Sequence, residues 1–328
     1  MTPFAYHRAR SIDDALRLGA SPGAHFLGGG TNLLDLAKGG VVQPLLMIDV
    51  TRLPLAEVAA TPDGGLRIGA MVRNSDAANH PLVRTRYPLL SQALVAGASP
   101  QLRNMATVGG NLLQRTRCHY FVDTAFEHCN KRAPGSGCDA IDGANRNHAI
   151  LGASPSCIAT HPSDMCVALA ALRASVRVRG PRGDRAIALA DFHRLPEDMP
   201  QRDTTLQPGE LVVAVDLPPD GFASHAHYLK LRDRASYAFA LVSVAAALDV
   251  RDGIVRDAAL ALGGVAHKPW RRAEAEARLV GRAPSDEAFG DAADVLLKDA
   301  RPASRNGFKL TLARRAIVRA LQTAGAQT

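Results

Sequence analysis

The sequence has no long apolar run, few aromatic residues and no close pair of cysteines. Only 5% of its 328 residues are aromatic, one of them a tryptophan, and its lysines and arginines are dispersed rather than striped. We therefore expect no membrane span and no nucleic-acid partner. Residues 1–10 lack the apolar core of a secretion signal, so the sequence predicts no signal peptide on this chain.

The charge and composition are those of a protein that folds around large cores. The chain is 47% hydrophobic and 21% charged, and its length suffices for two or three domains. The formal net charge of +8 indicates a solvated basic surface or a surface that faces an acidic partner subunit.

Four of the five cysteines fall in one stretch rich in glycine, proline and asparagine: Cys118, Cys129, Cys138 and Cys157. Zinc sites usually include a close pair of ligands, and this wide, irregular spacing disfavours zinc. An iron-sulfur cluster needs only four converging thiolates, and it would order a loop that has too few apolar residues for a core. Spacing alone leaves an iron-sulfur cluster, two disulfides, zinc and free thiols open.

The fifth cysteine has a different setting. Cys166 lies in an apolar segment that reads as a helix capped by Ser163. We expect it to pack in the core, because cysteine commonly acts as a small buried hydrophobe.

The hydrophobic pattern divides the chain into three zones, 1–55, 56–220 and 221–328, with a turn-rich boundary at 218–221. The first zone alternates helix and strand, the second mixes strands and helices around the cysteine stretch, and the third ends in an amphipathic helix. The expected helices lie near 11–16, from 32, and at 89–96, 163–172 and 308–318. The expected strands end at 27 or lie at 46–50, 66–70, 175–179, 211–217, 226–231, 241–248 and 255–262.

Two glycine-rich segments suggest phosphate binding. In Leu27-Gly28-Gly29-Gly30-Thr31-Asn32, between a strand and a helix, consecutive glycines would let backbone amides approach a pyrophosphate closely. The segment is neither a P-loop nor a G-x-G-x-x-G fingerprint. A second tight glycine turn, Thr107-Val108-Gly109-Gly110-Asn111, could add contacts to the same extended cofactor.

These two segments, together with His161-Pro162-Ser163-Asp164, resemble the FAD-binding subunits of the molybdenum hydroxylases, the xanthine dehydrogenase family. The resemblance covers nearly the whole chain and includes 238–245, which looks like the start of that family's C-terminal flavoprotein domain. It implies an α+β fold. Residues 1–55 and 56–220 would form the two FAD-binding subdomains of the PCMH, or vanillyl-alcohol-oxidase-like, type, and 221–328 a C-terminal α/β domain.

The cysteine stretch sharpens the resemblance. Most flavin subunits of the family pass almost directly from the Gly-Gly-Asn turn to the Pro-x-x-Asp segment, whereas here residues 115–160 form an excursion. The segments Arg115-Thr116-Arg117-Cys118 and Cys129-Asn130-Lys131-Arg132 are similar to the flavin subunits of periplasmic aldehyde oxidoreductases, which carry an extra 4Fe-4S cluster. The flavin subunit of 4-hydroxybenzoyl-CoA reductases, which also carries an added cluster, fits less well.

The resemblance implies roles for particular residues. Phe26 to Leu34 would wrap the FAD diphosphate, Asp164 would bind the adenosine end, and Lys230 would approach the flavin, with Tyr228 and Tyr237 as weaker candidates. The cofactor-binding set is Phe26, Leu27, Gly28, Gly29, Gly30, Thr31, Asn32, Leu33, Leu34, Thr107, Gly109, Gly110, Asn111, Asp164 and Lys230. The metal ligands would be Cys118, Cys129, Cys138 and Cys157.

The implied activity is electron transfer, with no catalytic residue on this chain. A large subunit with the molybdenum cofactor would oxidise an aldehyde, a small subunit with two 2Fe-2S clusters would pass the electrons on, and an external acceptor would reoxidise the FAD. His119, His128, His148 and His161 are expected to be hydrogen-bonded scaffolding. The complex would be periplasmic, by co-export with a signal-bearing partner, or cytoplasmic.

Three alternatives differ in class. They are a self-contained flavin oxidase, a subunit of the CoA-thioester reductase type, and a scaffold that binds zinc and a nucleotide without redox chemistry.

Overall fold

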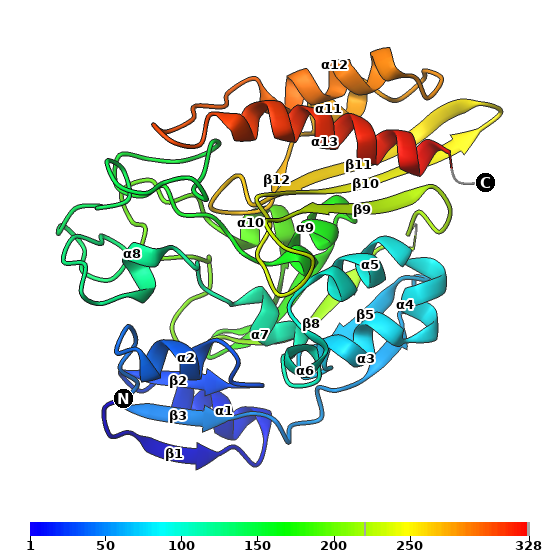
Figure 1. Cartoon of the computed structure of the whole chain (residues 1–328). Helices are drawn as coiled ribbons and strands as arrows, with labels where there is room; N and C mark the ends of the chain where they lie inside the picture. The colour runs from blue at the N-terminus through cyan, green and yellow to red at the C-terminus, as the bar shows by residue number, and fades with distance from the viewer. Residues whose placement is uncertain (220, 327–328) are drawn as a thin grey trace.

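The computed structural model describes residues 1–219 and 221–326 and contains three separate sheets (Figure 1). The expected boundary at 218–221 includes Asp220, which lies outside the described residues. No helix in the described part of the chain is long and apolar enough to cross a membrane.

The amino-terminal unit is a parallel three-stranded sheet with the order β1-β3-β2. Its strands are β1 (Ala5–Arg8), β2 (Ala24–Leu27) and β3 (Leu46–Asp49), joined by α1 (Ile12–Gly19) and α2 (Leu33–Lys38). Ser11 caps α1 by accepting a hydrogen bond from the amide of Asp14, as the sequence predicts. The glycine loop therefore leaves the carboxyl end of β2 and leads into α2.

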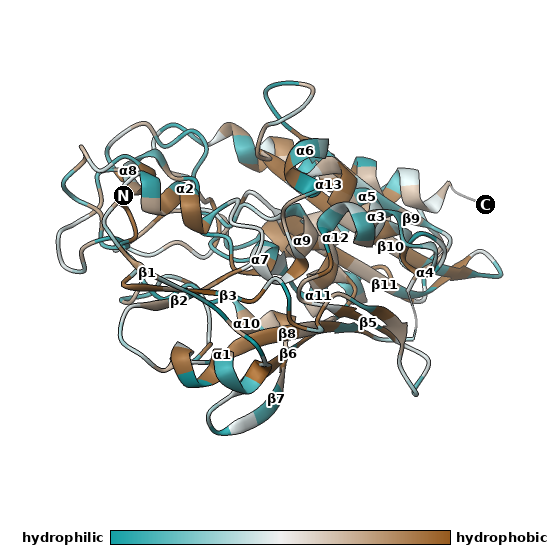
Figure 2. Ribbon diagram, turned by 90° about the horizontal axis from the view of Figure 1, so that it is seen from below, coloured by the Kyte–Doolittle hydropathy of each residue, from teal (hydrophilic) through white to brown (hydrophobic). Residues whose placement is uncertain are grey.

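The second sheet has five antiparallel strands in the order β4-β5-β8-β6-β7. They are β4 (Val58–Ala60), β5 (Leu66–Gly69), β6 (Ser175–Gly180), β7 (Gly183–Ala188) and β8 (Leu211–Leu217). In Figure 2, β5 and β8 are largely apolar, while the edge strand β7 is largely polar and exposed. The associated helices are α3 (Asn74–Asn79), α4 (Pro81–Arg86), α5 (Pro88–Ala96), α6 (Pro100–Arg103), α7 (Val108–Leu112), α9 (Asp164–Ala171) and α10 (Leu189–Phe192).

The carboxyl-terminal sheet is antiparallel, with the order β12-β11-β10-β9, and α13 crosses its outer face (Figure 1). Its strands are β9 (Ala226–Leu231), β10 (Val242–Arg251), β11 (Ile254–Gly263) and β12 (Trp270–Arg271). Its helices are α11 (Ala273–Ala277), α12 (Asp286–Leu297) and α13 (Phe308–Gly325). Helix α9 contacts β10 and β11 on the opposite side from α13, so it lies between this sheet and the second one.

The cysteine excursion has little regular structure, and its one helix is the short α8 (His119–Val122). It projects beside α2 of the amino-terminal unit (Figure 1). Two fully buried side chains of the carboxyl-terminal part hold its far end, because Asn306 and Lys309 both donate to the backbone carbonyl of His148.

One local expectation was wrong. Residues 107–111 do not form a simple tight turn, because Val108–Leu112 is the short helix α7, with Thr107 as its cap. The Thr107 hydroxyl accepts from the amide of Gly110, an N-cap bond that the Thr-x-x pattern permits as readily as a turn.

Candidate cofactor cavity and cysteine site

Residues from all three parts of the chain line one cavity of about 660 Å³. Thr31 lines it from the amino-terminal unit, Asn111 and Asp164 from the second zone, and Tyr237 and Gly264 from the carboxyl-terminal part. The residues that line the cavity are therefore far apart in the sequence, and both predicted glycine segments contribute to them.

The two glycine segments pack directly against each other. A Cβ atom on Gly29 would lie 1.9 Å from the backbone oxygen of Met105, and one on Gly28 would lie 2.9 Å from Oγ1 of Thr107. Gly30 has φ +74°, a left-handed conformation that side-chain-bearing residues rarely adopt. Glycine is required here by close backbone approach and by conformation.

Asp164 is held at the cavity wall by a buried ion pair. The Lys230 ammonium donates to Asp164 Oδ2 over 2.7 Å, and the Tyr228 hydroxyl donates to Asp164 Oδ1 over 2.7 Å. The side chains of Lys230 and Asp164 are only 4% and 7% exposed. Burial, with the neighbouring Asp164 carboxylate, raises the pKa of Tyr228 well above its ordinary value, so the phenol stays a donor.

The predicted cofactor residues take different positions around the cavity. Thr31, Asn111 and Asp164 line it, while Lys230 bonds Asp164 from behind. The remaining predicted residues support the wall without lining it: Phe26, Leu27, Gly28, Gly29, Gly30, Asn32, Leu33, Leu34, Thr107, Gly109 and Gly110. Of the two weaker candidates, Tyr237 lines the cavity and Tyr228 lies in the core beside Asp164.

Sequence reasoning missed several cavity residues, among them Asn74, Gln114, Asn147 and Asp233. They lie in loops and at element ends without a motif, so only the fold brings them together. Residues 233–234 and 237–241 also line the cavity, and the lack of a strand pattern between β9 and β10 marks them as a loop but does not place them at the cavity.

The structure brings the four cysteines of the excursion together. One small cavity is lined by Cys118, Cys129, Cys138 and Cys157. The backbones of Cys129 and Cys138 also pair in an isolated antiparallel β-bridge. All are free thiols, so the disulfide alternative was wrong for this structure.

The distances between the four thiols do not suit a single zinc ion. Among residues 1–219 and 221–326, only one group of at least three His, Cys, Asp or Glu has its ligand atoms within 4.8 Å of one another, and it contains none of these four. Tetrahedral zinc with Zn–S bonds of 2.3 Å would bring its sulfurs to about 3.8 Å from each other. In a 4Fe-4S cluster each thiolate binds a different iron, so the ligand sulfurs lie farther apart than in a zinc site.

The protein itself gives these thiols little help to ionise. Burial raises the pKa of Cys118 to about 12 and that of Cys157 to about 11. Burial also raises the pKa of Cys138. Thiolate ligands in such a place require a bound cation, which is how metal binding couples to folding.

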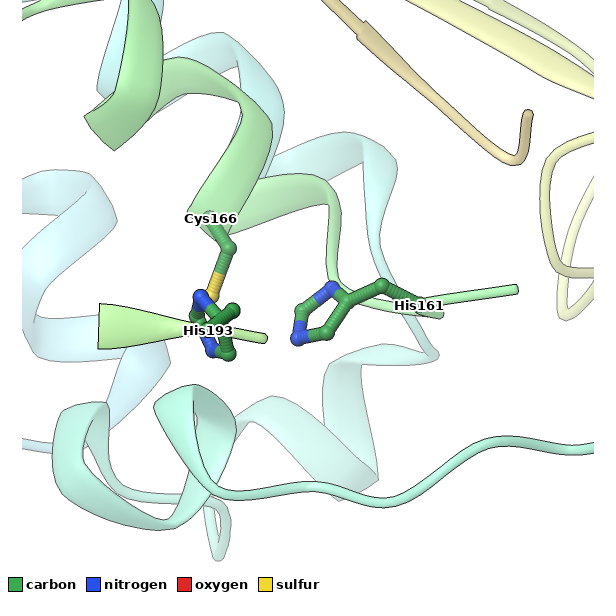
Figure 3. Close-up of side chains that lie close together, drawn as sticks. All are labelled: His161, Cys166 and His193. Carbon is green, nitrogen blue, oxygen red and sulfur yellow. The ribbon is translucent and has the colours of Figure 1, made fainter. Parts of the chain in front are cut away.

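The one tight group of ligand atoms in the described part of the chain is His161, Cys166 and His193 (Figure 3). The Cys166 sulfur points toward the ring of His193, and His161 faces them. Nδ1 of His161 accepts from the amide of Ser163, which places the proton of this neutral ring on Nε2 and leaves no lone pair there for a metal. Nε2 of His193 donates to the Leu112 carbonyl over 2.9 Å, and its Nδ1 has no hydrogen-bond partner among the described residues. Fully buried Cys166 packs in the main core as expected.

The histidines of the excursion differ in their surroundings. His128 bonds Asp139 near the surface, while His148 is buried with Nε2 at 3.1 Å from the sulfur of Cys118. His119 and His148 also line the large cavity.

Two known domain families match the chain. Residues 2–220 match the FAD binding domain in molybdopterin dehydrogenase, and residues 227–324 match the CO dehydrogenase flavoprotein C-terminal domain.

Individual proteins match over the full length. The chain is 52% identical to the aldehyde oxidoreductase FAD-binding subunit PaoB of Escherichia coli, with 100% of both chains covered. It is 29% identical to the glyceraldehyde dehydrogenase medium chain of Sulfolobus acidocaldarius, covering 92% of this chain and 89% of that one. Among solved structures, carbon monoxide dehydrogenase from Hydrogenophaga pseudoflava superimposes with a TM-score of 0.77 at 28% identity, covering 99% of each chain.

Proposed function

Because the chain belongs to the family of FAD-binding medium subunits of the molybdenum hydroxylases, we propose that it is the FAD- and 4Fe-4S-containing electron-transfer subunit of a molybdenum-dependent aldehyde oxidoreductase. FAD binding and an oxidoreductase complex follow from the family itself. The aldehyde substrate, the cluster and the electron path are the proposal. Its strongest support is the convergence of four free thiols beside the large cavity.

FAD would occupy the large cavity, with its diphosphate against 28–31 and 107–111. The cavity of about 660 Å³ has the size of a cofactor site, and the glycines there remove side chains that would block backbone amides. Asp164, fixed by Lys230 and Tyr228, would accept a hydrogen bond from a hydroxyl of the cofactor. Lys230 would act through Asp164 rather than by direct contact.

The four thiolates would hold the 4Fe-4S cluster in the cavity that they line. When bound, FAD accepts an electron pair, and an iron-sulfur cluster carries one electron at a time. The chain's own residues position both groups and exclude water from the cysteines, since Cys129 and Cys157 are buried. No residue of this chain is assigned to aldehyde oxidation.

The partners would be a large subunit with the molybdenum cofactor and a small subunit with two 2Fe-2S clusters. The PaoB relative is an aldehyde oxidoreductase subunit by name, which favours aldehydes over aromatic CoA thioesters as the substrate of the complex. Co-export with a signal-bearing partner would place the complex in the periplasm, and a partner without a signal would leave it in the cytoplasm. Cell fractionation separates these two outcomes.

The test is flavin, iron and sulfide analysis of the anaerobically purified complex. The expected result is one FAD, and iron in excess of the 2Fe-2S clusters by the content of one 4Fe-4S cluster. Cys129→Ser should lose that excess and keep the FAD. Cys166→Ala is the matched control, because this cysteine lies in the core away from the cysteine cavity, and it should keep both.

Two results would overturn the proposal in different parts. A wild-type complex with FAD but no excess iron would remove the cluster, and zinc in its place would favour the scaffold alternative. Turnover of aromatic CoA thioesters with no activity on aldehydes would assign the complex to the other reductase class.

A further inference from the structure

Cys118 lies in the wall between two cavities. It lines the large cavity, together with His148, and it also lines the small cavity of the four cysteines. Cys129, Cys138 and Cys157 line only the small cavity. A cluster bound by the four thiolates would therefore face the flavin site through its Cys118 ligand.

Cys118 has a specific hydrogen-bond partner. Nε2 of His148 lies 3.1 Å from its sulfur, and the His148 side chain is buried, with the residue 3% exposed. A thiolate accepts hydrogen bonds and donates none, so the imidazole proton must be on Nε2 when Cys118 is ionised. Nδ1 of His148 has no hydrogen-bond partner among the described residues, so the contact with Cys118 is the only hydrogen bond of the ring there.

The backbone holds His148 in this place from both sides. Its amide donates to the carbonyl of Asn145 over 3.0 Å. Its carbonyl accepts from Lys309 Nζ over 3.0 Å and from Asn306 Nδ2 over 3.2 Å, and both donors are fully buried. The carboxyl-terminal part of the chain thus fixes an imidazole of the cysteine excursion.

We propose that His148 is a positioning residue that donates an N–H···S hydrogen bond to the Cys118 thiolate, on the side of the bound cluster that faces the flavin site. This bond raises the reduction potential of the cluster. This inference rests on the proposed function. A donor to a ligand sulfur stabilises the reduced, more negative cluster more than the oxidised one. The other three cysteines have no histidine nitrogen within hydrogen-bond distance in the described structure, so Cys118 is the one ligand that would receive a hydrogen bond from a histidine.

The test is a redox titration of the purified complex, followed by the electron paramagnetic resonance signal of the reduced 4Fe-4S cluster. His148→Phe removes the donor, and the midpoint potential should shift to a lower value. His148→Gln keeps an N–H donor and should restore part of that shift. His25→Gln is the control, because His25 lies on β2 of the amino-terminal unit and lines neither cavity, and it should leave the potential unchanged.

The outcomes separate this inference from the proposed function. Absence of the cluster from the wild-type complex contradicts the proposed function. A cluster in His148→Phe with the wild-type potential overturns the role of His148. If His148→Phe does not retain iron, pulsed resonance on wild-type complex with ¹⁵N-labelled histidine decides: coupling of one ring nitrogen to the cluster supports the bond, and no such coupling overturns it.

Discussion

The hydroxyl of Ser163 donates a hydrogen bond to Oδ1 of Asn111 over 2.7 Å. This bond joins the second glycine segment to the start of α9, directly across the root of the cysteine excursion. The same hydroxyl accepts from the amide of Cys166 and caps α9. Ser163 and Asn111 both line the large cavity, so the Ser163 side chain fixes two parts of its wall.

Ser163→Ala should therefore weaken both folding and FAD binding. Loss of the cap and of the bond to Asn111 should lower the free energy of unfolding by about 1–2 kcal/mol. Urea denaturation and the rate of FAD release measure the two effects. Ser285→Ala is the control, because Ser285 caps α12 through Ala288 away from the cavity. Equal FAD release from both variants would contradict the role of Ser163.

The buried pair of Asp164 and Lys230 should be intolerant of losing one partner. Lys230→Met leaves a buried carboxylate without its cation and should cost about 3–5 kcal/mol of unfolding free energy. The double variant with Asp164→Asn should recover part of that loss. Arg314→Met is the comparison, because its pair with Asp294 is half exposed and should contribute little to stability. Denaturation of these variants and of the Asp164→Asn single variant checks the coupling, and additive losses would contradict it.

The sequence predicts the parts of this molecule that depend on local pattern. Strands such as Leu211–Leu217 and helix α9 appear where alternation, apolar runs and caps place them. Thr31 of the glycine loop lines the cavity, and the close backbone approach at Gly28 and Gly29 leaves a direct trace in the sequence.

The features that the sequence does not predict depend on contacts between residues far apart in the chain. Lys230 meets Asp164 because β9 packs near the start of α9, and no local pattern encodes that pairing. His148 reaches Cys118 within an excursion that has almost no regular structure, so neither periodicity nor spacing places its ring. The sequence indicated that the four cysteines would come together, but it did not indicate which side chains would contact them.

Gly29→Ala should disrupt the contact between the two glycine segments. The added Cβ would lie 1.9 Å from the backbone oxygen of Met105, so one segment must move. The expected cost is about 1–3 kcal/mol, with reduced FAD content in the purified complex. Gly307→Ala is the control, because nothing lies within 4 Å of its added Cβ and its φ of −57° suits alanine. Wild-type FAD content in Gly29→Ala would show that the cofactor does not depend on this close approach.

Acid should destabilise the fold through the buried imidazole of His193. Burial lowers the pKa of His193 from its ordinary value of 6.5 to about 4. The unfolded chain then binds more protons than the folded one between these values, so stability falls as the pH decreases from 6.5 to 4. The full effect of this ring is on the order of 3 kcal/mol below that window. Urea denaturation across the window should show a shallower loss for His193→Gln than for the wild type. An unchanged slope in His193→Gln would mean that other buried groups, such as His267 with its pKa of about 4, carry the acid sensitivity.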